Sequence, residues 1–159
     1  KLCDTFNIPI VSLVDEPGFL IGPDAEKAGT ILHGTEAVLA TTESTVPWTT
    51  IMIRKSFGVA AAAHYGPDGY VLAWPSAESG PLPLEGGVAV AFKKEIAEAS
   101  DPEAKRKELE EKMAKNQNPF PRAEAFSVHE IIDPRETRKY IALWAERIQS
   151  QLRVKLLQK

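Results

Sequence analysis

The stretch WTTIMIRKSFGVAAAAH, residues 48–64, contains the two transitions that decide the fold. Its first part, Trp48–Ile53, is rich in threonine and isoleucine, which favours a β-strand. Its last part follows Gly58 and consists of a valine, four alanines and a histidine. Because alanine is the best helix former, we expect a helix to start just after Gly58 and to cover Val59–Ala63. The stretch therefore predicts a strand, a glycine turn and a helix in close succession.

Shorter segments on both sides continue this alternation. Ile8–Val14 is a nearly continuous apolar run, which is typical of a buried parallel strand, and the turn signal DEPGF follows it at residues 15–19. Tyr70–Trp74 and Glu130–Ile132 predict two further short strands. Strands that alternate with helices indicate layers of the α/β class.

The second half of the chain predicts three more helices. The first covers Gly86–Ile96. The second is a very polar helix at residues 103–115, which begins at a capping residue, an early proline and an acid in SDPE, residues 100–103. Few of its side chains are apolar, so we expect it to project from the body. A break is expected at Asn118–Pro121. Asp133 then opens the last helix, whose apolar stripe comprises Ile141, Trp144, Ile148 and Leu152.

Composition and charge argue against several classes of protein. The 159 residues, 43% of them hydrophobic, suit one globular domain with a real core. The net charge of −3 gives no basic excess, which disfavours a dedicated nucleic-acid binder. No apolar run reaches the length of a membrane span. Cys3 is the only cysteine and the three histidines are scattered, so we expect no intrachain disulfide and no zinc site.

Four motifs occur in a fixed order: VDEPGF at 14–19, IRKSFGVA at 53–60, AWPSAE at 73–78 and IIDPRETR at 131–138. Together they resemble the carboxyltransferase (β) subunit of biotin-dependent acyl-CoA carboxylases, the group that includes propionyl-CoA carboxylase β chains. The resemblance covers nearly the whole chain. It implies a crotonase-like (ClpP/crotonase) α/β fold, a spiral of β-β-α units. Residues 1–159 would be the C-terminal domain of such a subunit, truncated at its N-terminus, with the polar helix projecting.

The resemblance also implies a reaction. Such enzymes remove a proton from the α-carbon of an acyl-CoA, which then accepts CO2 from N1 of carboxybiotin. Negative charge grows on the carbonyl oxygens of the thioester and of biotin, and preorganised N–H donors stabilise it. By resemblance, one oxyanion hole maps onto the backbone amides of Val59 and Ala60, directly after Gly58. A helix start suits this role, because its first N–H groups have no partner within the helix.

Departures from the family pattern bear on the same site. Many relatives have a second glycine at the position of Val59, and valine adopts a positive φ only at a cost. Relatives with short acyl substrates often carry an acid where this chain has Ala62, so we expect a roomier and less polar pocket. Pro81 and Pro83 also change the loop that follows Glu78.

Other candidate residues each have two interpretations. Asp15 is either a carboxylate of the site or a side chain that stabilises its turn. Pro17, Gly18 and Phe19 either shape a biotin or substrate pocket, with Phe19 as a wall for biotin, or pack in the core. Arg54 and Lys55 either attract CoA phosphates or are solvated charges, whereas His64 is expected at a helix surface rather than as a base.

The resemblance implies partners as well: a biotin carboxyl carrier and a biotin carboxylase, the N-terminal carboxyltransferase half, and further copies in a trimer-based homo-oligomer. It places the protein in the cytoplasm, or in the mitochondrial matrix of a eukaryote. We expect the chain to be a fragment, inactive on its own. Two alternatives stay open. One is a biotin-dependent acyl-CoA decarboxylase subunit that runs the transfer in reverse, and the other is a non-catalytic scaffold that docks the biotin carrier.

Overall fold

The computed structural model describes residues 1–157, with the side chains of Glu85 and of residues 155–157 left aside. In this part of the chain, five strands form one sheet in the order β1-β2-β3-β5, and β4 also pairs with β2. Every pair of neighbouring strands is parallel, which confirms the expected α/β class. The strands are β1 (Ile10–Glu16), β2 (Trp48–Phe57), β3 (Tyr70–Ala73), β4 (Glu78–Gly80) and β5 (Glu130–Ile131).

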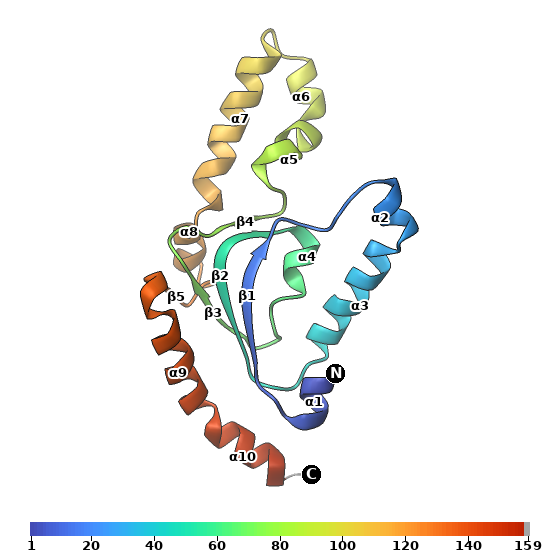
Figure 1. The fold of residues 1–159 in the computed structure, drawn as a ribbon. Helices are drawn as coiled ribbons and strands as arrows, with labels where there is room; N and C mark the ends of the chain where they lie inside the picture. The colour runs from blue at the N-terminus through green and yellow to red at the C-terminus, as the bar shows by residue number, and fades with distance from the viewer. Residues whose placement is uncertain (158–159) are drawn as a thin grey trace.

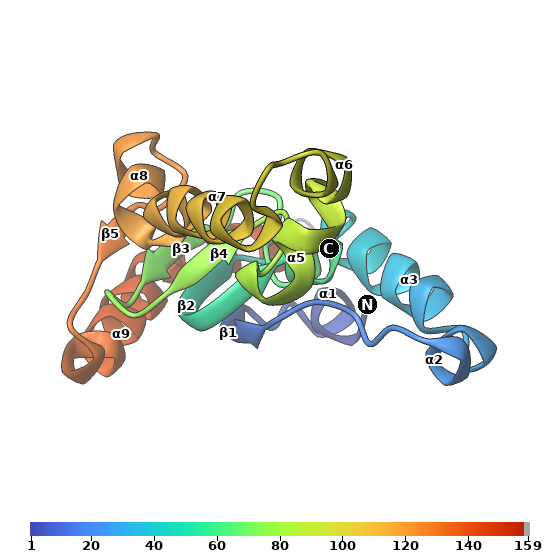
Figure 2. The same ribbon diagram turned by 90° about the horizontal axis from the view of Figure 1, so that it is seen from above.

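The helices surround this sheet and extend beyond one of its ends (Figures 1 and 2). They are α1 (Leu2–Phe6), α2 (Pro23–Lys27), α3 (Thr30–Thr42), α4 (Gly58–Ala62), α5 (Leu84–Ala91), α6 (Lys93–Ala97), α7 (Pro102–Gln117), α8 (Pro119–Glu124), the 3-10 turn η1 (Pro134–Glu136), α9 (Thr137–Arg147) and α10 (Gln149–Leu157). In residues 1–157, no helix combines the length and the apolar character needed to cross a membrane.

Strand β2 is the centre of the sheet and is longer than predicted. Its first half pairs with β3, from Thr49 to Met52, and its last three residues pair with β4. Between these halves the register with β1 shifts: Val14 faces Met52, whereas Glu16 faces Ser56. Three residues of β2 thus lie opposite one residue of β1, which is a bulge that redirects the strand. The predicted end at Ile53 was wrong because the polar residues after it continue this strand.

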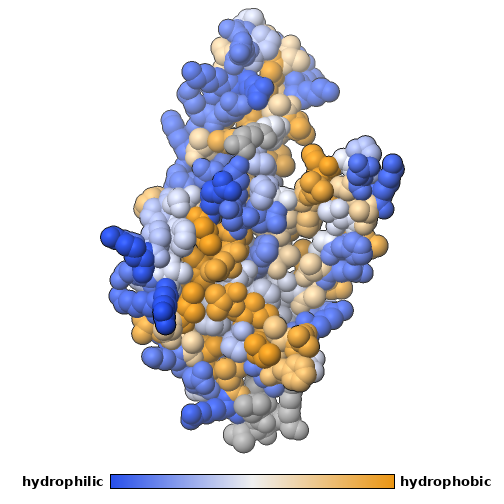
Figure 3. Space-filling view, in the orientation of Figure 1, coloured by the Kyte–Doolittle hydropathy of each residue, from blue (hydrophilic) through white to orange (hydrophobic). Residues whose placement is uncertain are grey.

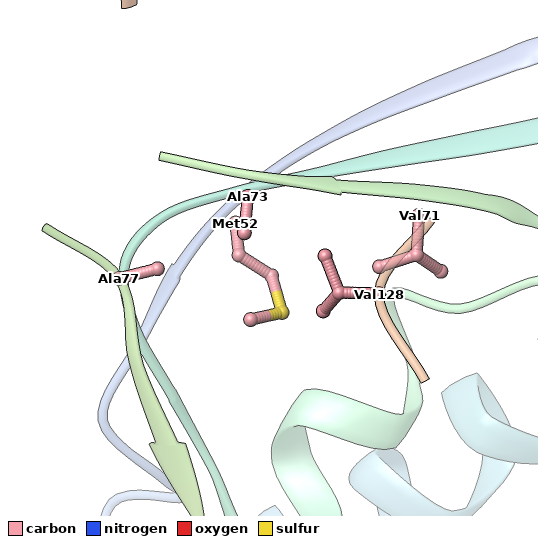
Figure 4. Close-up of a cluster of buried hydrophobic side chains, with 5 residues drawn as sticks. All are labelled: Met52, Val71, Ala73, Ala77 and Val128. Atoms are coloured by element: carbon pink, nitrogen blue, oxygen red, sulfur yellow. The ribbon is translucent and has the colours of Figure 1, made fainter. Parts of the chain in front are cut away.

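The core lies on both faces of the sheet, because successive residues of a strand point to opposite sides. On one face, Ile51 and Leu72 pack with Ile132 and with Tyr140 and Ile141, of which the last two belong to α9. On the other face, β2 and β3 meet the segment that leads into β5. Figure 4 shows the buried cluster on that face: Met52, Val71, Ala73, Ala77 and Val128.

Strand β1 is parallel, as predicted, but it is not buried throughout. It lies at the end of the sheet, and its outward residues Val11 and Leu13 are exposed, Leu13 by 56%. Figure 3 shows an apolar area over this strand. Alternation of exposed and covered side chains is typical of a strand with one open face rather than of a fully covered one.

Helices α5, α6 and α7 form a lobe beyond the sheet (Figure 1), as expected for the polar helix. Helix α7 begins at Pro102 and is capped by Asp101, which accepts hydrogen bonds from the N–H groups of Glu103 and Ala104. The single helix predicted over Gly86–Ile96 is instead two, α5 and α6, which are separated at Phe92.

The break predicted at Asn118–Pro121 is confirmed at Asn118, where α7 has ended, but it is shorter than expected, because α8 begins at Pro119. Asn118 caps this helix by accepting a hydrogen bond from the N–H of Phe120. Prolines are compatible with the first turn of a helix, where their missing N–H has no partner to lose.

Candidate functional site

Asp15 occupies the bulge between β1 and β2. Its carboxylate accepts hydrogen bonds from Arg54 Nε at 3.1 and 3.2 Å and from the backbone N–H of Lys55 at 3.2 Å. Arg54 Nη2 lies 3.1 Å from the same carboxylate. These donors, the Arg54 side chain first, lower the pKa of Asp15. Of the two predicted roles, the contacts match the structural one, since the side chain joins the two strands where their register shifts.

The start of α4 lies at the end of β2, as the sequence predicted. Gly58 adopts φ +65°, a left-handed conformation that side chains other than glycine rarely adopt. A Cβ atom there would lie 3.4 Å from the carbonyl oxygen of Pro81. The turn at Gly58 thus passes close to the loop after β4, and its left-handed conformation, rather than a lack of space, favours glycine.

Helix α4 presents two different faces. Ala60 and Ala61 are buried, whereas Gly58, Val59 and Ala62 are exposed. Val59 and Ala62 are three residues apart, so they share the outer face of the helix. Within residues 1–157, the only residues other than glycine with positive φ are Asn7 and Phe126. Val59 therefore needs no glycine-like conformation to form this helix.

The amides at the start of α4 face no acceptor within the helix, because the first N–H groups of an α-helix lack a carbonyl one turn back. Among residues 1–157, neither Val59 nor Ala60 donates its N–H to a backbone carbonyl of a turn, loop or cap. No side chain caps this end of the helix. The geometry is therefore that of two adjacent amides at a helix start without a side-chain cap.

The segment after β1 forms a tight turn at the same end of the sheet. Gly18 adopts φ +132°, and its N–H donates to Glu16 Oε1 at 3.0 Å. The ring of Phe19 lies against α3: a Cβ atom on Gly34 would come within 2.3 Å of it. Phe19 thus packs on a helix, and Gly34 provides the space for its ring.

Parallel strands place their carboxyl ends at one edge of a sheet, which is where ligands bind in open α/β sheets. The structure brings three predicted segments to this edge: the turn after β1, the start of α4 and the loop after β4 (Figure 1). Sequence reasoning noticed Pro81 but not that its carbonyl lies beside Gly58. No local signal marks that contact, since it joins residues far apart in the chain.

The histidines have structural contacts. His64 follows α4 at the end opposite to Val59, and its Nδ1 lies 3.3 Å from Ser12 Oγ. His129 accepts a hydrogen bond from the N–H of Val71 at 3.0 Å. In the same region Tyr65 is partly buried beside Ser56, with 2.7 Å between the two hydroxyl oxygens, and burial raises the pKa of this tyrosine.

A cavity of about 460 Å³ lies at the other end of the sheet, beside the first residues of β2 and β3. Trp48, Tyr70 and Trp144 form its apolar walls, and Asp68 and Arg147 contribute charges. Its volume does not make it the site, because no residue of α4 and no residue of the four motifs lines it.

Known proteins resemble this chain over most of its length. The model of the carboxyl transferase domain family matches residues 1–159. The chain is 43% identical over 146 residues to the methylmalonyl-CoA carboxyltransferase 12S subunit of Propionibacterium freudenreichii subsp. shermanii, a match that covers 89% of this chain. It is 42% identical to the propionyl-CoA carboxylase carboxyltransferase subunit of Haloferax mediterranei and 40% identical to the methylmalonyl-CoA decarboxylase subunit alpha of Propionigenium modestum. Each match spans 28% of the relative's length.

Solved structures agree. The transcarboxylase 12S hexamer with methylmalonyl-CoA and methylmalonic acid bound superposes with a TM-score of 0.82 and 42% identity, over 93% of this chain and 29% of that one. A single-chain long-chain acyl-CoA carboxylase superposes with a TM-score of 0.71 and 28% identity, over 90% of this chain and 15% of that one. The family match, the sequence relatives and the fold are consistent with one another: the chain belongs to the carboxyl transferase domain family.

Proposed function

We propose that this chain is part of a biotin-dependent carboxyltransferase that moves CO2 from carboxybiotin to the α-carbon of an acyl-CoA. One observation carries the proposal: two adjacent backbone amides, of Val59 and Ala60, begin helix α4 directly after a left-handed glycine. The named activities of the 12S subunit and of the propionyl-CoA carboxylase subunit support it. So does the position of α4 at the carboxyl edge of the sheet.

The amides of Val59 and Ala60 would act on an oxygen that gains negative charge. N–H groups at a helix start point outward, and the helix dipole adds partial positive charge there. Such donors stabilise an oxyanion without any nucleophilic side chain, which explains why the segment has none. The exposed side chains of Val59 and Ala62 would form an apolar wall beside these amides.

Biotin fits these residues, because its ureido carbonyl accepts hydrogen bonds and its thioether ring is apolar. When bound as carboxybiotin on a partner protein or domain, it supplies the activated CO2. Pro17, Gly18 and Phe19 would border this place from the turn after β1. Asp15 would fix the start of that turn through its contacts with β2. In the proposed reaction, this chain positions the reactants and stabilises developing negative charge, and no covalent bond forms to it.

The finer fold and the assembly belong to the same proposal. Residues 1–159 would be the C-terminal crotonase-like domain, in which β-β-α units form a spiral. The pairing of β3 and then β4 with successive parts of β2 supports such units. The proposed partners are a biotin carboxyl carrier, a biotin carboxylase and the N-terminal half of the carboxyltransferase, within a trimer-based homo-oligomer. The hexamer of the transcarboxylase 12S structure supports this assembly.

A second function uses the same site in reverse, with CO2 passing from an acyl-CoA acid to biotin. The specific observation in its favour is the relative named as a methylmalonyl-CoA decarboxylase subunit. Its 40% identity is close to the 43% and 42% of the carboxyltransferase and carboxylase relatives. The same residues of α4 would serve the transfer in either direction.

Two departures from the family pattern, Val59 and the loop with Pro81 and Pro83, would favour the scaffold alternative. Val59 forms the helix without a positive φ, so its side chain does not distort the amide. The Pro81 carbonyl borders Gly58, at ordinary van der Waals distance from a Cβ placed there. Neither feature removes the proposed donors.

The test is transfer of a labelled carboxyl group to acyl-CoA by the complete gene product that contains this sequence, from a biotin carrier that biotin carboxylase has charged with labelled bicarbonate and ATP. Acetyl-, propionyl-, methylcrotonyl- and long-chain acyl-CoA are offered separately. We expect label in one of the acyl-CoA products. Release of CO2 from an acyl-CoA acid with no incorporation would favour the decarboxylase. No transfer in either direction with a demonstrably carboxylated carrier would favour the scaffold.

A further inference from the structure

The end of α4 opposite to the proposed amides is fixed by side chains from two other elements. Thr41 Oγ1, from α3, lies 2.9 Å from the carbonyl oxygen of Ala63. Trp48 Nε1 and Thr50 Oγ1, from β2, donate to the carbonyl oxygen of His64 at 3.0 and 2.7 Å. Thr41, Trp48 and Thr50 are called the α4 donors below. Their acceptors belong to Ala63, the residue at which α4 ends, and to His64 directly after it.

Thr50 makes the best defined of these contacts. Its side chain is 0% exposed, and the hydroxyl has this single protein acceptor. Thr41 shares its one proton with the carbonyl of Ala37, 3.0 Å away. Trp48 packs tightly over Gly66, where a Cβ atom would lie 2.5 Å from Trp48 Cβ. The donors therefore have little freedom to follow α4 if it moves.

Helix α4 needs such contacts because it has little stability of its own. It has five residues and no side-chain cap, whereas isolated helices shorter than about 12 residues are marginal in water. Its last turn is tightened by hydrogen bonds between residues three apart, such as the one from the N–H of His64 to the carbonyl of Ala61 at 3.0 Å. The orientation of the helix is therefore set by the elements around it.

Both ends of α4 are connected to the same strand. Phe57 ends β2 and leads directly into Gly58, whereas Trp48 and Thr50 lie near the beginning of β2. Figure 1 shows α4 beside the sheet, so the covalent link at one end and the hydrogen bonds at the other fix its direction. The direction of a helix decides where its first N–H groups point.

We propose that Thr50, assisted by Trp48 and Thr41, is a positioning residue for the carboxyl transfer: it fixes the end of α4 and thereby aims the amides of Val59 and Ala60. This inference rests on the proposed function, because it assigns that site its alignment. Thr50 touches no substrate in this role and acts through the His64 carbonyl alone.

The chain offers a matched control one residue away. Thr49 is also buried, with 1% exposure, and its hydroxyl also donates to a backbone carbonyl, that of Tyr70 at 2.9 Å. Its acceptor belongs to β3 rather than to the end of α4. Thr49→Val and Thr50→Val therefore remove the same chemical group from the same strand, and only the second loosens α4.

Both variants are made in the complete gene product and assayed for carboxyl transfer with its biotin carrier. We expect Thr50→Val to lower kcat by about tenfold to a hundredfold with the KM for acyl-CoA nearly unchanged, because small misplacements of catalytic groups have such effects. Thr49→Val is expected to change kcat less than about twofold at a similar loss of thermal stability. Thr50→Ser, which restores a hydroxyl, is expected to recover most of the rate. Equal loss of kcat in both valine variants would overturn the inference.

A second measurement is independent of activity. Hydrogen–deuterium exchange of the peptide that covers residues 57–65 is expected to become faster in Thr50→Val and to stay unchanged in Thr49→Val. Unchanged exchange in Thr50→Val would overturn the positioning role whatever the rates are. If the unmodified protein transfers no carboxyl group, the proposed function fails, and the exchange comparison still decides whether Thr50 fixes α4.

Discussion

Helices α4 and α7 differ in what stabilises them. Helix α7 has 16 residues and its own cap, Asp101, and an ion pair four residues apart, Arg106 with Glu110 at 2.8 Å. Helix α4 has five residues, no side-chain cap and no charge, and it depends on the strand before it and on the α4 donors. Helix α7, which has its own cap and ion pair, lies beyond the sheet. Helix α4, which is proposed for catalysis, depends on contacts with other elements.

This difference predicts how substitutions act. A change in α7 is expected to alter stability locally and leave transfer intact. A change in α4 is expected to alter transfer out of proportion to stability. Four substitutions test this contrast, in order of decreasing effect.

The largest effect is expected at Ala60, where Ala60→Pro removes the backbone N–H. Loss of one oxyanion donor lowers kcat by about 10²–10³. Ala60→Gly keeps the N–H and is expected to cost much less. Steady-state transfer rates of both variants, with circular dichroism to verify folding, measure the effect. Full activity of a folded Ala60→Pro protein would end the oxyanion assignment.

The next effect concerns the left-handed turn at Gly58. Gly58→Ala forces a Cβ into this conformation, which costs about 1–2 kcal/mol, so the turn is expected to shift and kcat to fall about tenfold. Gly29→Ala is the matched control, because Gly29 precedes α3 with φ +73° and lies away from α4. Thermal melts and transfer rates are compared, and similar activity in both variants would contradict the contrast between the two regions.

On the α7 side of the comparison, Asp101→Ala removes a cap that accepts two N–H groups. Loss of such a cap costs about 1 kcal/mol of stability. We expect a lower midpoint of urea unfolding with an unchanged kcat. A fall in kcat that matches the fall in stability would show that the lobe is coupled to the site.

The smallest effect is expected at the bulge through which β2 reaches α4. The pKa of Asp15 is lowered in the folded protein from an ordinary value near 3.8, so its contribution is present above that value and is lost as the pH falls through the lowered pKa. Asp15→Asn should therefore destabilise at pH 7, by less than about 1 kcal/mol because the pair is partly exposed, and progressively less as the pH falls below 3.8. Urea midpoints from pH 2 to 7 measure this. A difference between the two proteins that stays constant from pH 2 to 7 would contradict this expectation.

Local patterns in the sequence were enough to locate most elements. The glycine at 58 and the alanines after it predicted the start of α4, and Asp101 with Pro102 predicted the start of α7. These signals act within one turn of the chain, where propensity and capping decide.

The errors occurred where distant residues decide. Arg54 and Lys55 interrupt the apolar pattern, yet they belong to β2 because Asp15 and β4 pair with that part of the strand. Phe92 separates α5 from α6 without a glycine or proline to signal it.

The α4 donors were missed for the same reason. The threonines of β2 were taken only as residues with strand propensity, and nothing in the local pattern distinguishes Thr50 from Thr49. Their acceptors, on His64 and Tyr70, are 14 and 21 residues away along the chain. Such contacts follow from the three-dimensional arrangement, so a single sequence does not show them.

The position of β1 has a consequence for handling the protein. In the described part of the sheet, β1 has a neighbour on one side only, and exposed Val11 and Leu13 alternate along it. An open strand edge of this kind is a template on which another polypeptide can add a strand. We expect the 159-residue chain, prepared by itself, to self-associate as its concentration rises. Its self-association would then depend on the open edge of β1 and not on the chemistry at α4.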